Sequence, residues 1–168
     1  MSVVGPSEST HSSPTQLDET DHRIIAALRR RHRASVSDLS RFLGLARGTV
    51  HGRLQRMERE GVILGYGPDL TLTTAGFPVR AFTNLTIAQG RHDQVVAALR
   101  AIPNILEVHT ITGPGDILIK IGARSNDHLH ELLQEIAGIH EVAQVTTQLA
   151  LASPVLRSAA DLLVATSR

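Results

Sequence analysis

Apolar residues recur at helical spacing in short segments of the first third of the chain. The first predicted helix covers residues 18–31, because Asp18 stands three residues before Asp21 in a variant of the capping box and arginines close the segment. The second predicted helix covers residues 36–43 and repeats this arrangement, with Ser35 as its N-cap. Both segments therefore carry their own start signals, and each offers one apolar face for packing.

A third predicted helix, over residues 47–60, combines an apolar stripe with a basic surface. Gly48 and Gly52 lie inside it, where each glycine costs about 0.5–1 kcal/mol relative to alanine. Ala46 stands where a capping serine or threonine is expected, which costs about 1 kcal/mol more. Such a helix relies on tertiary support or forms fully on DNA, and its glycines would let the backbone approach a phosphate closely. The apolar stripe is formed by Val50, Leu54 and Met57.

The second and third helices, joined by a short turn that contains glycine, have the sequence form of a helix-turn-helix. From residue 79 on, the apolar pattern changes to the alternation of β-strands. The fold class we predict is α+β, a winged-helix-like helix-turn-helix followed by a ferredoxin-like βαββαβ domain, whose antiparallel four-stranded sheet carries both helices on one face. Its predicted elements are strand 79–88, helix 91–101, strand 105–112, strand 117–121, a helix capped by Ser125 and strand 142–151.

Shifts in composition predict five segments. Residues 1–16 are rich in serine, threonine and proline and lack periodicity, which is typical of a disordered tail. A helix-turn-helix domain (17–64) is followed by a linker (65–77), the ferredoxin-like domain (78–154) and a C-terminal extension (155–168). The glycine-rich stretch after the third helix is expected to hold a short strand as well as the linker. The extension is expected to form a helix against the sheet or a partner chain.

The predicted sheet carries apolar residues on both faces, whereas helices cover only one face of such a fold. An uncovered apolar face usually signals association. We therefore expect a homodimer formed through this domain.

The net charge of +1 conceals a basic segment joined to a mildly acidic one. Residues 29–59 hold nine arginines against Asp38 and Glu58, whereas residues 61–168 carry a net charge of −2. A basic patch attracts polyanions such as DNA, because neutralising phosphates releases condensed counterions. For a charge run taken alone, a solvated helix face is the simpler alternative.

Composition narrows the range of functions. The absence of cysteine excludes disulfides, cysteine–zinc sites and thiol nucleophiles. The scarcity of aromatics disfavours stacking platforms for single-stranded nucleic acid. No apolar run could span a membrane or act as a signal peptide, so we expect a cytoplasmic protein without a membrane partner. His128 and His130 face apart on a helix, and no catalytic cluster stands out, so we expect no metal, no cofactor and no enzymatic activity.

Four motifs in register carry a specific resemblance over about residues 17–154. They are Leu17-Asp18-x-x-Asp21-x-x-Ile24-Ile25-x-x-Leu28, Leu39-Ser40-x-x-Leu43-Gly44-Leu45, Val50-x-x-Arg53-Leu54-x-x-Met57-Glu58-x-x-Gly61-Val62-Ile63 and Thr112-Gly113-x-x-Asp116-Ile117-Leu118. Together they resemble the Lrp/AsnC, or feast/famine, family of prokaryotic transcriptional regulators. The first three are similar to the helices of its helix-turn-helix, and the fourth to a turn of its effector domain.

The resemblance implies that the third helix enters the major groove of double-stranded DNA, where arginine can read guanine bidentately. A dimer would then read two half-sites about one helical turn apart. Arg56 and Arg59 are expected to lie nearer the DNA backbone. Alternatively, they pair with Glu58 and Glu60. The other contact candidates on the third helix are Arg47, Thr49, His51 and Arg53, and the phosphate-contact candidates on the second are Ser35, Ser37 and Arg41.

The resemblance also implies a small-molecule effector, usually an amino acid, bound between dimers that assemble into tetramers or octamers. Backbone N–H groups of the implied turn can hold a carboxylate, and Asp116 can hold an ammonium. From spacing alone, a plain hairpin turn with a capping aspartate is the simpler interpretation. The implied effector residues are Thr112, Gly113, Pro114, Gly115, Asp116, Thr146, Thr147, Ala152 and Ser153.

We therefore expect a sequence-specific, ligand-responsive DNA-binding regulator. An architectural nucleoid protein that reads DNA shape and phosphates is one alternative. A metabolic enzyme or ligand-storage module, in which the basic helices are incidental, is another. In the favoured interpretation, Arg53→Ala weakens DNA binding and lowers its salt dependence while the oligomer stays intact.

Overall fold

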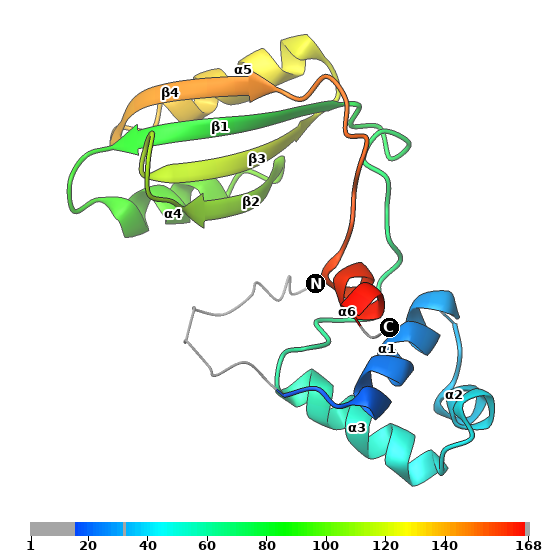
Figure 1. Cartoon of the computed structure of the whole chain (residues 1–168). Helices are drawn as coiled ribbons and strands as arrows, with labels where there is room; N and C mark the ends of the chain where they lie inside the picture. The colour runs from blue at the N-terminus through cyan, green and yellow to red at the C-terminus, as the bar shows by residue number, and fades with distance from the viewer. Residues whose placement is uncertain (1–15, 32, 167–168) are drawn as a thin grey trace. The chain divides into compact units, whose positions relative to one another are not determined.

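The computed structural model describes residues 16–31 and 33–166, which form two compact units (Figure 1). One unit contains the described residues up to Pro68 together with those from Leu156 onward, and the other contains Asp69–Val155. The predicted disordered tail lies outside the described residues except for Gln16. Among the residues described, no helix is long and apolar enough to cross a membrane.

The first unit begins with helices α1 (Glu19–Arg30) and α2 (Val36–Leu43), and both start as the sequence predicts. Asp18 caps α1, with a complete capping box in which the Asp21 carboxylate accepts the Asp18 N–H at 3.0 Å. Ser35 caps α2 by the same reciprocal arrangement with the third residue of the helix. These local bonds fix the residue at which each of the two helices begins.

Helix α3 (Arg47–Arg59) packs one apolar stripe into the core of this unit and leaves its remaining faces toward solvent or α1. Its N-cap, Ala46, makes no side-chain capping bond, as the sequence indicates. The stretch after α3 contains no strand in the structure, which corrects the predicted short strand there. Instead Val62 and Ile63 donate their N–H groups to the Met57 carbonyl. Their apolar side chains pack against the core of this unit, next to the apolar stripe of α3.

The C-terminal extension forms helix α6 (Ala159–Thr166), which belongs to the first unit and packs against α1 (Figure 1), whereas the sequence led us to expect packing against the sheet or a partner chain. Leu163 lies on the core of the first unit, and Arg29 Nη2 of α1 pairs with Asp161 Oδ2 at 3.1 Å. Ser158 N–H and Oγ both donate to the Asp161 carboxylate at the start of the helix. Helix α6 is thus a structural part of the helix-turn-helix unit.

The second unit has the predicted split βαβ topology, with an antiparallel sheet in the order β2-β3-β1-β4. Both of its helices lie on one face of this sheet (Figure 1). The core between the layers contains fully buried Leu85, Val95, Leu99, Ile119 and Ile136. The elements are β1 (Val79–Ile87), α4 (His92–Arg100), β2 (Ile105–Thr110), β3 (Ile117–Ala123), α5 (Asn126–Ala137) and β4 (Val142–Leu149).

The sheet face away from the helices is mixed in polarity, which corrects the expectation that both faces are apolar. Residues that alternate with the core positions of β1 point to this face, among them Phe82 and Asn84. Phe82 is 37% exposed and opposes Lys120, whose Nζ binds Glu107 at 2.6 Å. Apolar side chains such as Phe82 therefore stand beside charged and polar side chains on this face.

Candidate DNA interface and effector site

The outward surface of α3 carries most of the expected DNA-contact residues of that helix. Arg47, Thr49 and His51 are all exposed, and they lie in its first two turns. The apolar stripe of the helix, Val50, Leu54 and Met57, is buried. The start of α3 therefore presents a basic residue, a hydroxyl and an imidazole to solvent, and each of these groups can bind base edges or phosphates.

Arg53 and Arg56 instead bind acids at the start of α1. Arg53 Nη1 lies 2.6 Å from Asp18 Oδ2 and 2.9 Å from Asp21 Oδ1, and Arg56 Nη2 binds Asp21 Oδ2. The Asp21 side chain is completely buried, whereas the two arginine side chains are about one third exposed. Arg56 therefore pairs with Asp21 and not with Glu58 or Glu60, because one flank of α3 faces the start of α1.

The same contacts shift the pKa values of the two carboxylates. The hydrogen bond from Arg53, followed by that from the Asp21 N–H, lowers the pKa of Asp18 to about 2. Burial alone would raise the pKa of Asp21, but hydrogen bonds from the Asp18 N–H, Arg53 and Arg56 outweigh it and lower the pKa. Both acids are therefore ionised near neutral pH and tie α3 to α1.

Sequence reasoning missed the role of these acids and that of Tyr66. Asp18 and Asp21 read as capping residues only, although an acid at a buried helix position requires a basic partner. Tyr66 donates its hydroxyl to Glu58 of α3, and burial together with this bond raises the pKa of Tyr66 to about 12. The chain that leaves the helix-turn-helix is thereby bonded to α3.

The candidates on α2 differ in how free they are. The Ser35 hydroxyl is engaged in the helix cap and donates to Asp38 Oδ2 at 2.6 Å. Arg41 lies 3.3 Å from Asp38 Oδ1, but its side chain is 81% exposed. Ser37 is half-buried. Arg41 is therefore the α2 candidate with the greatest reach.

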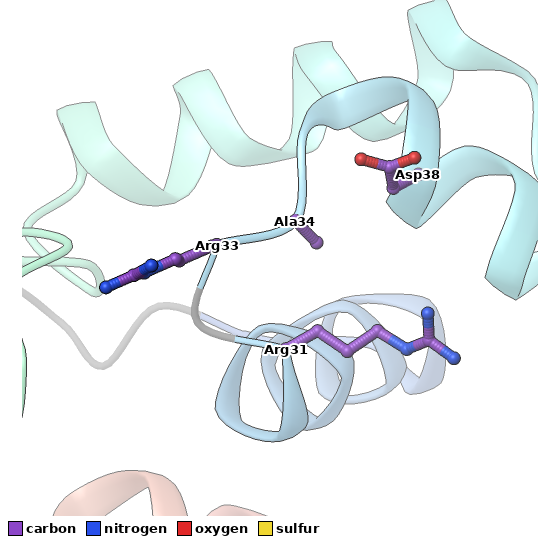
Figure 2. A pocket seen from close by; sticks show the side chains of 4 residues that line it. All are labelled: Arg31, Arg33, Ala34 and Asp38. Atoms are coloured by element: carbon purple, nitrogen blue, oxygen red, sulfur yellow. The ribbon is translucent and has the colours of Figure 1, made fainter.

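An open hollow lies at the turn between α1 and α2 (Figure 2). It is lined by Arg31, Arg33, Ala34 and Asp38, and Figure 2 shows the two arginine side chains extending in different directions from the turn. Arg31 also stacks its guanidinium over the ring of Phe42, 4.3 Å from the centroid. The hollow belongs to the basic unit and contains none of the expected effector residues.

The expected effector turn, residues 112–116, is tightly bonded to the end of β1. Ile87 donates its N–H to Asp116 Oδ2 at 2.9 Å, and the Asp116 N–H donates to the Leu85 carbonyl at 2.8 Å. Gly115 has φ +106°, and a Cβ there would lie 3.0 Å from the Leu85 oxygen. One oxygen of Asp116 thus acts as a turn cap, as in the simpler interpretation of the motif.

The remaining effector candidates do not gather around this turn within one chain. Thr147 Oγ1 bonds Thr83 Oγ1 at 3.0 Å on the helix-covered face, whereas Thr146 points to the other face. Ser153 accepts a bond of 2.9 Å from Arg80 Nη1 near the start of β1. The turn at residues 112–116 is bonded to Leu85 and Ile87 at the opposite end of β1, at least five residues of strand from Arg80, or about 17 Å. Ala152 precedes Ser153 and lies with it.

The histidines and acids form no cluster of three that could hold a metal ion within the part of the chain that the structure describes. The two units thus differ in chemistry. One presents a basic helix to solvent, and the other combines a sheet with a glycine turn.

A basic helix-turn-helix joined to a ferredoxin-like domain defines a DNA-binding regulator with a separate ligand-binding domain. The sequence model for a winged helix-turn-helix DNA-binding domain matches residues 17–63, and that for the Lrp/AsnC ligand binding domain matches residues 80–160. The chain belongs to the Lrp/AsnC family of transcriptional regulators. The matched domains and relatives are regulators and not enzymes, as the sequence predicts.

The relatives cover most of the chain. It is 30% identical over 135 residues to the HTH-type transcriptional regulator FL11 of Pyrococcus horikoshii. This similarity covers 80% of this chain and 89% of that protein. It is 28% identical over 144 residues to the regulatory protein AsnC of Escherichia coli, spanning 84% and 95% of the two chains.

Solved structures share the fold. The structure of E. coli AsnC superimposes with a TM-score of 0.79 at 27% identity, covering 86% of this chain and 99% of that chain. A transcriptional regulator from Neisseria meningitidis, crystallised as an L-Met complex, has a TM-score of 0.76 at 22% identity, covering 86% and 96% of the two chains.

Proposed function

We propose that this regulator reads a specific duplex sequence with the first two turns of α3 and responds to a small-molecule effector, an amino acid. The observation that carries the DNA part is the exposed start of α3, where Arg47, Thr49 and His51 are accessible to solvent. Recognition helices contact base edges through their N-terminal residues. Because Arg53 and Arg56 are engaged by α1, we assign them chiefly to positioning α3 for this contact.

Phosphate contacts from α2 would fix the register of α3 on the duplex. Arg41 supports this assignment because its side chain is largely exposed near the start of the helix-turn-helix turn. Ser35 caps the N-terminus of the same helix and Ser37 lies in its first turn, and a helix N-terminus favours anions.

The effector part rests on the distribution of the candidates over the sheet. The turn at residues 112–116 and the segment at residues 152–153 lie at opposite ends of β1 in one protomer. A site that uses both sets therefore needs a second copy of the domain, which supports a homodimer and its further assembly to a tetramer or octamer. The Neisseria relative of the same fold was crystallised with an amino acid, which supports the class of effector.

DNA binding is tested with Arg47→Ala in the full chain. The affinity for a duplex selected by the wild-type chain from a random library should fall. The slope of log K against log[salt] should become less steep by about 0.9, the value expected for the loss of one phosphate contact. Arg100→Ala, at an exposed arginine of α4, is the matched control and should leave both unchanged. Equal binding by Arg47→Ala and wild type would refute the assignment.

The same measurement separates the architectural alternative. A wild-type chain that binds selected and mixed-sequence duplexes with equal affinity would be an architectural protein with little sequence preference. If the wild-type chain binds neither duplex at low salt, both DNA-binding interpretations are excluded, and only a ligand-binding role remains.

The effector is sought by a thermal-shift screen of the twenty amino acids. A ligand that binds only the folded state raises its melting temperature by mass action. We expect one or a few amino acids to raise the melting temperature and, in sedimentation experiments, to change the oligomer distribution. Absence of any shift would argue against an amino-acid effector for this chain.

A further inference from the structure

Gly48 and Gly52 lie one turn apart on the face of α3 that points away from the core. The apolar stripe of the helix lies on the opposite side, and both glycines are exposed. Unlike Gly44 and Gly61, which end helices with positive φ, neither of them adopts a conformation that favours glycine. Gln55 and Arg59 continue the same outward face toward the end of α3.

The fold of this chain does not require either glycine. Apart from the adjacent residues and the backbone of α3 itself, a Cβ on Gly48 or Gly52 would meet no atom within 4 Å, so the space beside both positions is open. Alanine would favour the helix at both positions, and α3 already begins without a side-chain cap. Where a sequence gives up local stability without any gain in packing, a functional surface is the expected reason.

We propose that Gly48 and Gly52 are specificity-determining residues, which let the backbone of α3 lie directly against the base-pair edges of the major groove. This inference rests on the proposed DNA contact by α3. An α-helix with side chains is about 10–12 Å across and the major groove is about 12 Å wide, so outward side chains set how deeply a helix enters. With no side chains at these two positions, Arg47, Thr49 and His51 reach base edges from the flanks of the helix.

The test uses Gly48→Ala and Gly52→Ala in the full chain. Each variant is expected to raise the melting temperature of the helix-turn-helix unit by about 2–8 °C. Each is also expected to lower the affinity for the duplex selected by the wild-type chain tenfold or more, because the added methyl groups hold α3 away from the bases. Libraries selected with the variants should yield different sequences from those selected with wild type.

Ala46→Ser is the matched control, since it stabilises the start of α3 without adding atoms to its outward face. It is expected to raise the melting temperature while keeping the wild-type affinity for the selected duplex. If Ala46→Ser lowers the affinity as much as the glycine variants do, DNA binding needs a soft helix and not open space, and the proposal is overturned. Unchanged affinity and unchanged selected sequences in both glycine variants overturn it as well.

Failure of the proposed function has a different signature. A wild-type chain that selects no sequence shows that specific DNA reading by α3 is absent, and the glycine inference is lost with it. In the other case, the wild-type chain selects a sequence that Arg47→Ala binds poorly, while Gly48→Ala and Gly52→Ala bind it well. That result supports the proposed function and overturns only the inference about the glycines.

Discussion

The buried carboxylate of Asp21 accepts a hydrogen bond of 2.9 Å from Nη1 of Arg53, 32 residues further along the chain. Asp21 also closes the capping box of α1 through the Asp18 N–H, so one side chain both starts a helix and binds its neighbour. Because a buried charge without a partner is costly, the position of α3 relative to α1 depends on this pair.

Replacing Asp21 by asparagine keeps the shape of the side chain and removes its charge. We expect the helix-turn-helix unit to lose about 1–3 kcal/mol of unfolding free energy, since charge-assisted bonds from Arg53 and Arg56 are lost. Glu19→Gln, at an exposed acid in the same helical turn, is the control and should change the free energy little. Chemical unfolding followed by circular dichroism measures both, and equal stability of the two variants would contradict the role given to Asp21.

The same contact changes how Arg53→Ala should be interpreted. This variant removes partners of Asp18 and Asp21, so it is expected to lower the stability of the unit as well as any DNA binding. A loss of affinity in Arg53→Ala therefore reports DNA contact only if the melting temperature is unchanged. Arg47 is exposed and gives the cleaner measurement.

Acid should destabilise the helix-turn-helix unit through these carboxylates. The pKa of Asp18 is lowered from its ordinary value of 3.8 to about 2, and that of Asp21 is lowered as well. A carboxylate whose pKa is lowered in the folded state contributes stability above the unfolded pKa, and this contribution is lost as the pH falls through the folded pKa. The melting temperature of the unit should therefore fall steeply between about pH 4 and about pH 2.

Asp18→Asn tests the origin of this acid sensitivity. The variant should be less stable than wild type near neutral pH, and its melting temperature should depend less on pH in the acid range. Hydrogen exchange of the α1 amides at several pH values follows this unit separately from the other. Parallel pH profiles for variant and wild type would show that other groups dominate.

The starts and ends of the first helices could be predicted because their causes are local. Asp18 and Ser35 form the capping boxes that their spacing predicts, and Gly44 ends α2 with φ +66°. Such signals act over three or four residues, so they can be read without knowing the fold. The alternation of residues in β1 is local in the same way, and it predicted the strand but not which of its faces is buried.

The contacts that sequence reasoning missed join residues far apart in the chain. Arg29 and Asp161 are 132 residues apart, and nothing in either segment indicates the other. A run of arginines predicts a basic surface, but the packing of α1 on α3 decides which of them are neutralised. For the effector candidates a local signal was present, because the pleat of a strand places Thr146 and Thr147 on opposite faces.

The docking of α6 on α1 is tested with Leu163→Ala. Leu163 is partly buried against the core of the helix-turn-helix unit, so its truncation should cost this unit about 1–2 kcal/mol. Leu162→Ala changes the same residue type in the same helix at a position that is 60% exposed, and it should cost less. Hydrogen exchange of α1 should increase in Leu163→Ala, and equal protection in both variants would place the helix elsewhere in solution.

The effector turn is tested with Gly115→Ala, since Gly115 has φ +106° and a Cβ there would lie 3.0 Å from the Leu85 carbonyl oxygen. The strained backbone should cost the ligand-binding domain about 1–3 kcal/mol. The damage should be local, because the Asp116 amide and the Ile87 amide are bonded across this turn and should exchange faster. Gly65→Ala, at a glycine with open space and no positive φ, is the control and should leave both amides protected. Full protection of the Ile87 amide in Gly115→Ala would show that Asp116 does not fasten the turn to β1.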